Sequence, residues 1–388
     1  MSVIAGRGRY LAGRVSAPAR ERRNGVDITR VRSTSFGRGS IIGRLSDYAS
    51  FYLRVLFELL ARRGVDGVIL LTTPPLLSFL GRIARRVRGQ RYAIWSMDLH
   101  PDAEIAAGML RPGSALARVL SWCNDVGYRG ADFVIDLGSY MKARIVAKGV
   151  PPASTFTVDV WSSREDIEPV PREANPLLDE LGLRDRFVAM YSGNAGLVHD
   201  FSDILEAMRR MRDDPRIYFL FVGGGPRRRE IEQFAAAHDI PNFAYRDYFP
   251  RDRLRFSLSV GDVHLISLRE PFVGISVPGK LYGIMAAGRP ALFVGPARCE
   301  SADAIRDAGC GAVIDPRAGD AAGEIVAALR ALSTNAALVA EQGRRARQAF
   351  LDRYERESNC ATFRRVIDGH WTTSAEKAGA ANAAIASA

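Results

Sequence analysis

The chain has 388 residues, of which 47% are hydrophobic and 25% charged, as in a globular protein large enough for two domains. Arginines interrupt every apolar run before it reaches the length of a membrane span. Four scattered cysteines show neither metal-site spacing nor a disulfide framework, which favours a reduced cytoplasm.

Charge is unevenly distributed along the chain. Residues 1–150 hold 24 Lys/Arg against 11 Asp/Glu, a balance of +13, whereas residues 151–388 hold 30 against 32. The basic half predicts contact with an anionic membrane surface or a phosphate-bearing partner, unless it reflects only a compositional preference for arginine. Because the chain has no helix-turn-helix, zinc-finger or aromatic RNA-binding signature, we expect no nucleic-acid partner.

Strand and helix patterns alternate through the first half. The opening is unusual, because no helix connects its first two strands, at 2–5 and 26–31, and the residues between them predict a loop. From residue 68 the alternation is regular, as expected for a parallel sheet with helices on its faces. We expect strands at 68–72, 92–96, 133–136 and 156–160, and helices at 41–63, 76–87, 114–128 and 139–148.

The expected helix 41–63 is amphipathic and basic. Its polar side carries Arg44, Arg54, Arg62 and Arg63. Such a helix can lie on an anionic membrane surface. Packing of its apolar side on a sheet is the commoner arrangement.

A second alternating set follows a proline-rich stretch at 166–185 that predicts an interdomain linker. The fold class is therefore α/β, with two facing Rossmann-like doubly wound domains and a cleft between them. We expect an N-terminal domain at 1–165, a second domain at 186–350, a C-terminal helix at 351–370 that packs back on the first domain, and a disordered tail at 371–388. The strands of the second domain are expected at 187–192, 217–222, 242–245, 263–267, 291–294 and 312–314.

Three loops of the second domain follow strands at their carboxyl ends, where ligands bind in open α/β sheets. Glycines there let the backbone approach a phosphate closely, although a tight strand–helix turn also needs them. Three such loops favour a nucleotide or phosphate site, and none matches a dinucleotide fingerprint or a P-loop. They hold Gly193 and Asn194, then Gly223, Gly224 and Gly225, then the segment 269–280 with Gly274.

Lys280 stands at the start of a predicted short helix, 279–287. Pro278 suits the first helical position, and Gly288 suits a left-handed cap at the other end. A helix that opens from a glycine-containing loop presents free N–H groups and a positive dipole end to an anion. We predict that Lys280, one of only four lysines in the chain, adds its charge to this site. A solvated surface lysine is the alternative.

Residues 191–197, 221–227 and 277–290 together resemble the C-terminal domain of family-4 glycosyltransferases with the GT-B fold. The most similar branch is that of bacterial colanic-acid and O-antigen biosynthesis, including fucosaminyl transferase-like enzymes. The resemblance implies transfer of a sugar from a nucleotide-sugar, UDP-linked in preference to GDP-linked, to a lipid-linked saccharide at the inner membrane face. It also implies retention at the anomeric carbon and no metal or other cofactor.

The sequence departs from the family pattern at several positions. Many members carry a spaced pair of glutamates where Ile275 and Gly283 stand here, and an Arg and a Lys where Asn194 and His199 stand. The resemblance therefore implies a diphosphate site made of Lys280, His199 and the backbone amides from Gly274 through Ile275 to Ser276. Relatives begin with a strand and a glycine-rich loop, which the resemblance predicts to be missing here.

On the acceptor side, Asp98 and His100 follow the predicted strand 92–96 and so face the expected cleft. One of them could orient the acceptor hydroxyl or move its proton. Alternatively, Asp98 caps the next segment and His100 is a structural histidine of the loop. Tyr248 or Phe249 could lie against the donor base, with core packing as the more ordinary role, and 227–229 predicts a solvated helix start.

Two other functions stay open at this point. An inactive relative would bind only nucleotide or membrane. A sugar-nucleotide epimerase of similar fold would need more carboxylates and histidines along the cleft than five scattered histidines allow. The favoured hypothesis is a cytoplasmic transferase, peripheral on the inner face of the plasma membrane.

Overall fold

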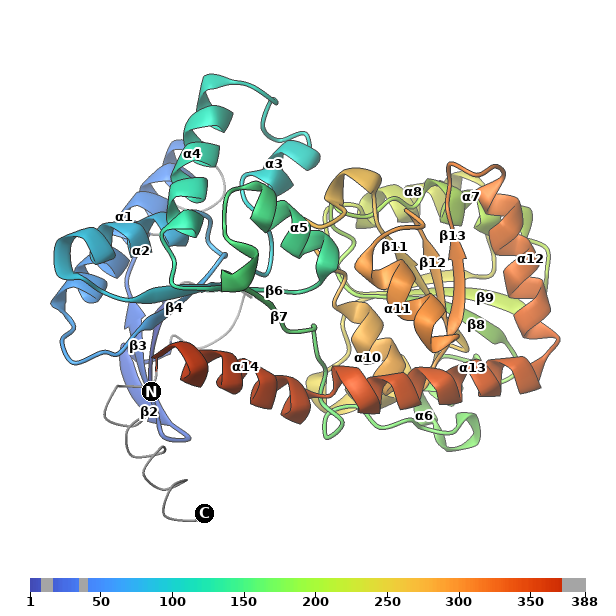
Figure 1. Ribbon diagram of the computed structural model, residues 1–388. Helices are drawn as coiled ribbons and strands as arrows, with labels where there is room; N and C mark the ends of the chain where they lie inside the picture. The colour runs from blue at the N-terminus through green and yellow to red at the C-terminus, as the bar shows by residue number, and fades with distance from the viewer. Residues whose placement is uncertain (8–16, 35–40, 372–388) are drawn as a thin grey trace, which may run out of the picture.

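The computed structural model describes residues 1–7, 17–34 and 41–371, which form an N-terminal and a C-terminal half lying side by side (Figure 1). Residues 372–388, nearly all of the expected disordered tail, lie outside the described residues, as do 8–16 of the expected opening loop.

The C-terminal half contains one parallel sheet of six strands in the order β10-β9-β8-β11-β12-β13. Successive residues of β8 enter hydrophobic clusters on opposite faces, Ala189 and Tyr191 on one and Val188 and Met190 on the other. Both faces are therefore buried, as in a doubly wound fold. The strands are β8 (Phe187–Ser192), β9 (Ile217–Val222), β10 (Phe243–Arg246), β11 (Val263–Ser267), β12 (Ala291–Val294) and β13 (Gly311–Ile314). The helices are α7 (Ser202–Arg210), α8 (Arg228–Ala237), α9 (Leu254–Leu258), α10 (Lys280–Ala286), α11 (Glu300–Ala308), α12 (Ala321–Ser333) and α13 (Ala336–Ala349).

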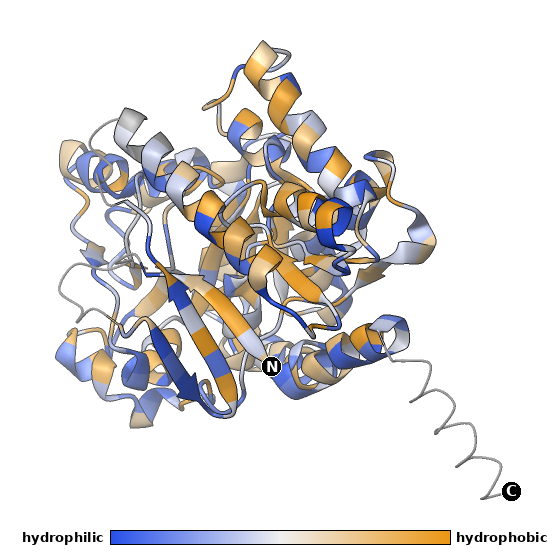
Figure 2. Cartoon of the chain, turned by 90° about the vertical axis from the view of Figure 1, so that its left-hand side faces the viewer, coloured by the Kyte–Doolittle hydropathy of each residue, from blue (hydrophilic) through white to orange (hydrophobic). Residues whose placement is uncertain are grey.

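The N-terminal half contains two sheets. A parallel sheet runs in the order β4-β5-β6-β7, and a smaller sheet runs in the order β1-β3-β2, with β1 parallel and β2 antiparallel to β3 (Figure 2). The strands are β1 (Ser2–Gly6), β2 (Arg20–Arg23), β3 (Val26–Val31), β4 (Val68–Leu71), β5 (Tyr92–Trp95), β6 (Val134–Asp136) and β7 (Thr155–Thr157). The helices are α1 (Ile41–Ala61), α2 (Leu77–Arg88), α3 (Asp102–Ala106), α4 (Ala115–Arg129) and α5 (Ser139–Ala147).

Helix α1 joins the two sheets of this half. Val55 and Leu59 are buried in a cluster that includes Val31 of β3 and, at its edge, Val68 of β4. Around these two residues, the apolar side of the helix therefore packs in the protein, as the commoner arrangement predicts. The side chains at 41, 42, 44 and 45, and with them Arg44, lie outside the described residues.

Strand β2 corrects the prediction of a loop between the first two strands. Its sequence, Arg-Glu-Arg-Arg, has no apolar alternation, and it pairs with β3 through the turn Asn24-Gly25. Asn24 and Gly25 have φ values of 50° and 78°, as the favoured two-residue hairpin turn requires. Helix α3 was likewise not expected.

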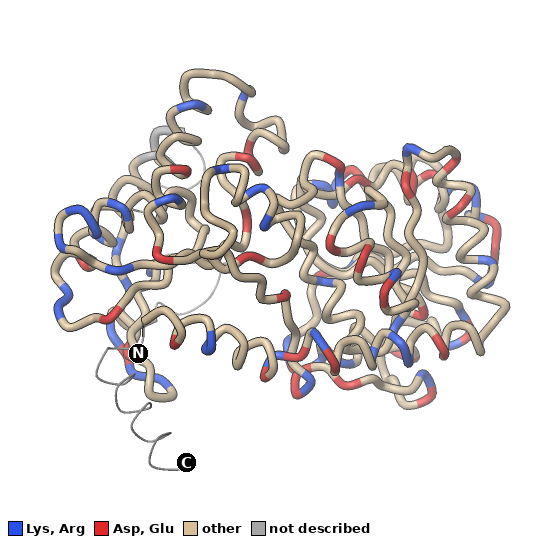
Figure 3. Tube along the Cα trace, viewed as in Figure 1, with Lys and Arg blue, Asp and Glu red and all other residues tan. Residues whose placement is uncertain are grey.

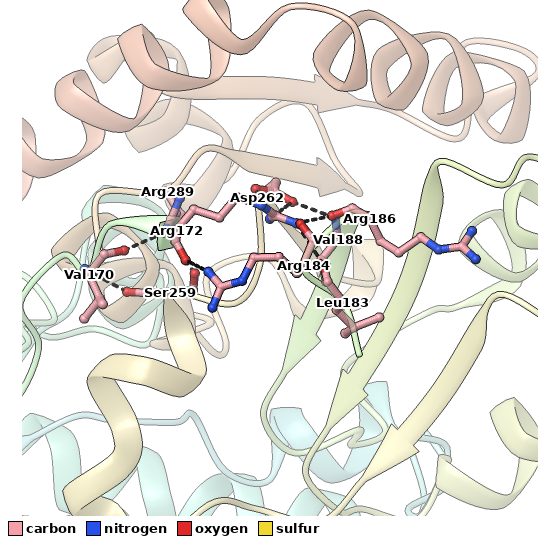
Figure 4. Close-up of polar contacts among 9 residues, drawn as sticks. All are labelled: Val170, Arg172, Leu183, Arg184, Arg186, Val188, Ser259, Asp262 and Arg289. Carbon is pink, nitrogen blue, oxygen red and sulfur yellow. Dashed lines mark hydrogen bonds and ion pairs between the residues drawn. The ribbon is translucent and has the colours of Figure 1, made fainter. Parts of the chain in front are cut away.

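The predicted linker is not a free connection, because most of it is fastened to the C-terminal half. Helix α6 (Pro176–Glu180) buries Leu177 and Leu178 completely. The guanidinium of Arg172 lies 2.8 and 2.9 Å from the two carboxylate oxygens of Asp262 and also donates to the carbonyl groups of Leu183 and Arg184 (Figure 4). Proline content indicated a loop, but these contacts make it part of the domain.

The chain returns to the N-terminal half at its end. After α13 a π-helical turn (Phe350–Tyr354) leads into α14 (Arg356–Trp371), which runs along the N-terminal half (Figure 1). The Trp371 ring lies 5.1 Å from that of Phe133, beside β6. Ser162 and Glu355 form a parallel bridge, so the outgoing and returning connections run side by side.

Candidate functional site

The strand order of the C-terminal sheet reverses between β8 and β11, which are neighbours in the sheet although β9 and β10 lie between them in the chain. Such a switch point is where open α/β sheets bind ligands, beyond the carboxyl ends of the strands. His199, in the loop after β8, spans this point, because its Nδ1 lies 2.6 Å from the carbonyl oxygen of Ser267 at the end of β11. This contact links the loops that follow β8 and β11 at the switch point.

Lys280, the first residue of α10, reaches into this place from a third loop. Its Nζ lies 2.5 Å from the hydroxyl of Tyr191 and 3.3 Å from Nε2 of His199. The Tyr191 hydroxyl donates to the carbonyl of Asn194, 2.9 Å away, so its oxygen accepts from the lysine. An ammonium has three N–H donors, and these two contacts leave one for a ligand.

Burial sets the charges of this cluster. It lowers the pKa of Lys280 well below the usual 10.5. Burial, together with the charge of Lys280, also lowers the pKa of His199 to about 3, so this imidazole is neutral at physiological pH. A neutral His199 that donates through Nδ1 presents only a lone pair at Nε2. In this structure it therefore accepts from Lys280, and its part in binding a diphosphate stays a prediction.

The glycine loops pack on one another beside Lys280. A side chain on Gly193 would place its Cβ 3.3 Å from Cε of Lys280, and one on Gly223 would place its Cβ 2.1 Å from the carbonyl oxygen of Gly193. Gly193, Gly223 and Gly225 have φ values of 137°, 137° and 123°, which favour glycine. Close loop packing therefore explains these glycines, and it also brings the loop of Asn194 against that of Gly224, where the N–H of Ala195 donates to the Gly224 carbonyl at 2.7 Å.

Two of the predicted site amides in the loop before α10 are used internally. The N–H groups of Ile275 and Ser276 donate to the carbonyl of Phe272, at 2.9 and 3.2 Å, so we exclude them from an anion site. Gly274, with φ 68°, lies against α5, where a Cβ would come within 2.6 Å of the carbonyl oxygen of Tyr140. The lack of a side chain at Gly274 therefore allows the two halves to come into contact here.

Helix α10 is shorter than predicted and begins at Lys280, so Pro278 precedes it by two residues. Because the helix has only seven residues, its dipole is small, and the charge of Lys280 would be the main attraction for an anion. Gly288 has φ 63°, as the expected left-handed cap requires.

The acceptor-side loop meets the donor-side loop directly. Asp98 forms an isolated antiparallel bridge with Ser276, and the N–H of Leu99 donates to the carbonyl of Ile275 at 3.0 Å. His100 is held inside the N-terminal half, with Nδ1 2.8 Å from Glu104 and a buried Nε2 that has no hydrogen-bond partner. Asp98 is thus at the junction, whereas His100 is turned into the protein.

Tyr248, Phe249 and Arg227 have different surroundings in the structure. Tyr248 is 58% exposed, and its ring lies against Gly223 and Gly224, whereas Phe249 packs at the edge of a core cluster. Core packing therefore holds for Phe249 alone. Arg227 is not solvated as predicted, because it donates to the carbonyl of His199 and to Glu230.

Within residues 1–7, 17–34 and 41–371, no group of three or more His, Cys, Asp or Glu side chains is placed to hold a metal ion. Two hollows, of about 380 and 320 Å³, lie away from the glycine loops, around Arg330 and around Arg88. In the same described part of the chain no single helix is long and apolar enough to span a bilayer, although α12 with α13 and the π-helical turn reach that length as a pair bent by 101°.

The architecture and the switch-point site define a GT-B fold, and solved structures share it. Sucrose-phosphate synthase of Thermosynechococcus elongatus matches with a TM-score of 0.71 at 15% identity, over 91% of this chain and 86% of that one. HepE of Anabaena, solved with UDP-glucose, matches with a TM-score of 0.69 at 12% identity, over 89% and 86%.

Sequence comparison shows which glycosyltransferases the chain is similar to. Residues 2–161 match the glycosyl transferase 4-like domain model. WbjE of Pseudomonas aeruginosa, described as a probable glycosyltransferase, is 28% identical over 68% of this chain and 66% of its own length. WcaI of Escherichia coli (strain K12), described as a colanic acid biosynthesis glycosyl transferase, is 27% identical over 67% and 65%. The matched segment thus spans just under two thirds of these relatives. The first half of the chain is thus similar to the glycosyl transferase 4-like domain, and the whole chain shares the GT-B fold.

Proposed function

We propose that the protein transfers a sugar from a UDP-sugar to a lipid-linked saccharide in the assembly of a bacterial surface polysaccharide. The observation that carries this proposal is the Lys280 amino group, which Tyr191 and His199 hold at the switch point and whose charged form a diphosphate would favour. The presence of UDP-glucose in the structure of HepE supports the choice of nucleotide, and the description of WcaI supports the choice of pathway class.

In the proposed reaction the bond between the anomeric carbon and the donor diphosphate breaks, and the acceptor oxygen forms the new bond with retention. Lys280 stabilises the negative charge that develops on the departing UDP, an electrostatic contribution that is large in a site shielded from water. Asp98, at the junction of the halves, orients the acceptor hydroxyl or accepts its proton. Tyr248, exposed over the glycine loop, offers a face for the uracil ring.

The direct test is calorimetric titration of UDP into the wild-type protein and the Lys280→Ala variant. Loss of a charged hydrogen-bond donor is expected to weaken UDP binding by about 10- to 100-fold. Arg251→Ala removes a C-terminal cation whose side chain is 82% exposed and should leave the affinity unchanged. Equal UDP affinity in wild type and Lys280→Ala would refute the site.

Activity separates the alternatives. A transferase releases UDP from a panel of UDP-sugars, faster when membrane extract supplies acceptor. An epimerase instead converts the sugar without releasing UDP, and an inactive relative binds UDP and does neither.

We also propose that the protein is cytoplasmic and works at the inner face of the plasma membrane. Lys and Arg are dense on the N-terminal half (Figure 3). The segment from the end of α3 through α4 exposes apolar side chains beside Arg111 and Arg118, and a surface with both properties suits an anionic bilayer. These apolar residues are Met109, Leu116, Val119 and Trp122, each more than half exposed.

Co-sedimentation with vesicles tests this placement. We expect binding to vesicles containing anionic phosphatidylglycerol, little binding to neutral vesicles, and about 10-fold weaker binding for the double variant Leu116→Ser/Trp122→Ser. Leu351→Ser, at an exposed apolar residue of the C-terminal half, is the matched control. Equal binding to neutral and anionic vesicles would count against the proposal.

A further inference from the structure

Tyr191 is a residue that the loop patterns did not single out, yet it contacts two parts of the site. We propose that Tyr191 is a positioning residue for diphosphate binding, whose hydroxyl orients the Lys280 ammonium and fixes the loop at Asn194. This inference rests on the proposed function for the identity of the ligand. The contacts on which it depends belong to the protein alone.

The directions of the hydrogen bonds carry the argument. The Tyr191 hydroxyl has one proton, which it gives to the Asn194 carbonyl at 2.9 Å, and its oxygen then accepts from Lys280 at 2.5 Å. Lys280 Nζ also lies 3.7 Å from the centroid of the Tyr191 ring, within the range of a cation–π interaction. Two acceptors, Tyr191 and His199, fix the direction of the third N–H of the lysine. Without the hydroxyl, only His199, at 3.3 Å, would remain of these two acceptors.

The same hydroxyl links two loops of different origin. Asn194 belongs to the turn after β8, and Lys280 begins α10, 86 positions later in the sequence numbering. The hydroxyl therefore holds the glycine loop and the cation in one arrangement before a ligand binds, which reduces the ordering that binding itself requires.

The ring of Tyr191 has a structural role that can be separated from that of its hydroxyl. It is fully buried, and its centroid lies 5.0 Å from that of Phe201 and 5.5 Å from that of Phe221. Phenylalanine keeps these contacts and removes only the oxygen. Tyr245 supplies the matched control, because its ring lies 5.8 Å from Phe221 and its buried hydroxyl has no hydrogen-bond partner.

The titratable groups that face the lysine define its pH dependence. They are Tyr191 on β8, His199 in the following loop and, across the core, His264 on β11, whose pKa falls to about 4 through burial and nearby positive charge. Both histidines are neutral above pH 6, so the lysine is the group that titrates as the pH rises. Removing an acceptor from the ammonium favours its neutral form, which moves the alkaline loss of anion binding to lower pH.

The experiment combines lysine NMR with UDP titration, using wild type, Tyr191→Phe and Tyr245→Phe. Because the chain has four lysines, ¹³C-labelled Lys gives a spectrum in which Lys280→Ala assigns the signal of interest. We expect Tyr191→Phe to shift the titration of Lys280 to lower pH and to weaken UDP binding about 10-fold at neutral pH. Tyr245→Phe should change neither quantity.

The outcomes distinguish this inference from the proposed function. An unchanged Lys280 titration in Tyr191→Phe overturns the inference, whatever the affinity for UDP. If wild type binds no UDP but the titration shifts, the identity of the ligand is wrong and the positioning of the lysine stands. If the titration shifts and UDP affinity stays equal, Tyr191 orients the lysine without serving the diphosphate, and the proposal as stated fails.

Discussion

The two halves of the molecule both place helices around a parallel sheet, but they complete that sheet differently. In the C-terminal half, six strands form one continuous sheet with buried side chains on both faces. In the described part of the N-terminal half, β1 and β4 belong to separate sheets, and α1 packs between them. The two sheets of the N-terminal half are therefore held together by helix packing. The C-terminal half also has the hydrogen bonds of one continuous sheet.

The difference extends to the site. Lys280, Tyr191 and His199 are held by hydrogen bonds within the C-terminal half, so this half contains the whole of the proposed anion site. Asp98 instead lies where its backbone pairs with Ser276 of the other half. Donor binding is thus expected to depend on one half, and acceptor binding on the contact between both.

The largest effect should follow from breaking the Arg172–Asp262 pair. Arg172→Ala leaves a buried carboxylate without its cation, which is expected to cost about 3–5 kcal/mol in the free energy of unfolding of the C-terminal half. Urea unfolding followed by hydrogen exchange assigns the loss to one half. Arg251→Ala, which breaks an exposed ion pair, should cost less than about 1 kcal/mol. Similar values for the two variants would contradict the idea that the predicted linker belongs to the C-terminal half.

A somewhat smaller effect, confined to the N-terminal half, is expected from Trp371→Ala. The indole is largely buried against Phe133, and its Nε1 donates to Asp132 at 3.2 Å. Truncation should destabilise this half by about 3–4 kcal/mol, because it leaves a cavity under α14. Hydrogen exchange should rise in β5 and β6 and stay constant in β8 and β9. Cys360→Ala, at an exposed position of α14, serves as control.

The smallest effect concerns pH and the buried carboxyl of Asp136 at the end of β6. Burial, with a contribution from Glu300 across the interface, raises its pKa from 3.8 to about 6. The folded protein therefore holds this proton more tightly than the unfolded chain. The stability contribution is fully present below pH 3.8 and is lost as the pH rises towards 6, by at most about 3 kcal/mol.

Asp136→Asn should remove this part of the pH dependence. The measurement is urea unfolding of wild type and variant from pH 4 to 7, with Asp213→Asn as the exposed control. Parallel stability curves for wild type and Asp136→Asn would show that the carboxyl does not titrate in this range.

Much of the fold could be predicted from the sequence because buried parallel strands are short apolar runs. The expected strands 187–192, 217–222, 263–267 and 291–294 have the bounds that the structure shows. Strand β2 was missed because its four charged residues carry no such pattern, although Asn24-Gly25 is a hairpin signal. The Asn175-Pro176 start of α6 was a similar signal within a stretch that looked like a linker.

The site was less predictable, because strand position gives the neighbourhood of a residue and not its partners. Lys280 and His199 were expected in one place, and the structure brings them within 3.3 Å. That His199 accepts from the lysine follows from its contact with Ser267, 68 positions away in sequence, which no local pattern records. Tyr191 was missed for the same reason, since a tyrosine in a buried strand gives no sign of its hydroxyl's neighbours.

The chain passes between the two halves near Ser162 and again near Glu355, and these two connections lie side by side. The N–H of Ser162 donates to Tyr354 and that of Arg356 donates to Ser162, at 3.0 and 2.9 Å, so the two covalent connections are fastened to each other, as a single pivot would require. Rotation about it would separate Asp98 from Ser276 while the backbone near Ser162 hardly moves. Admission of a sugar between the halves would then require this contact, and those of α5 with Val273, Glu300 and Asp303, to part. Spin labels on α4 and α8 would report that motion as a change in distance when UDP binds.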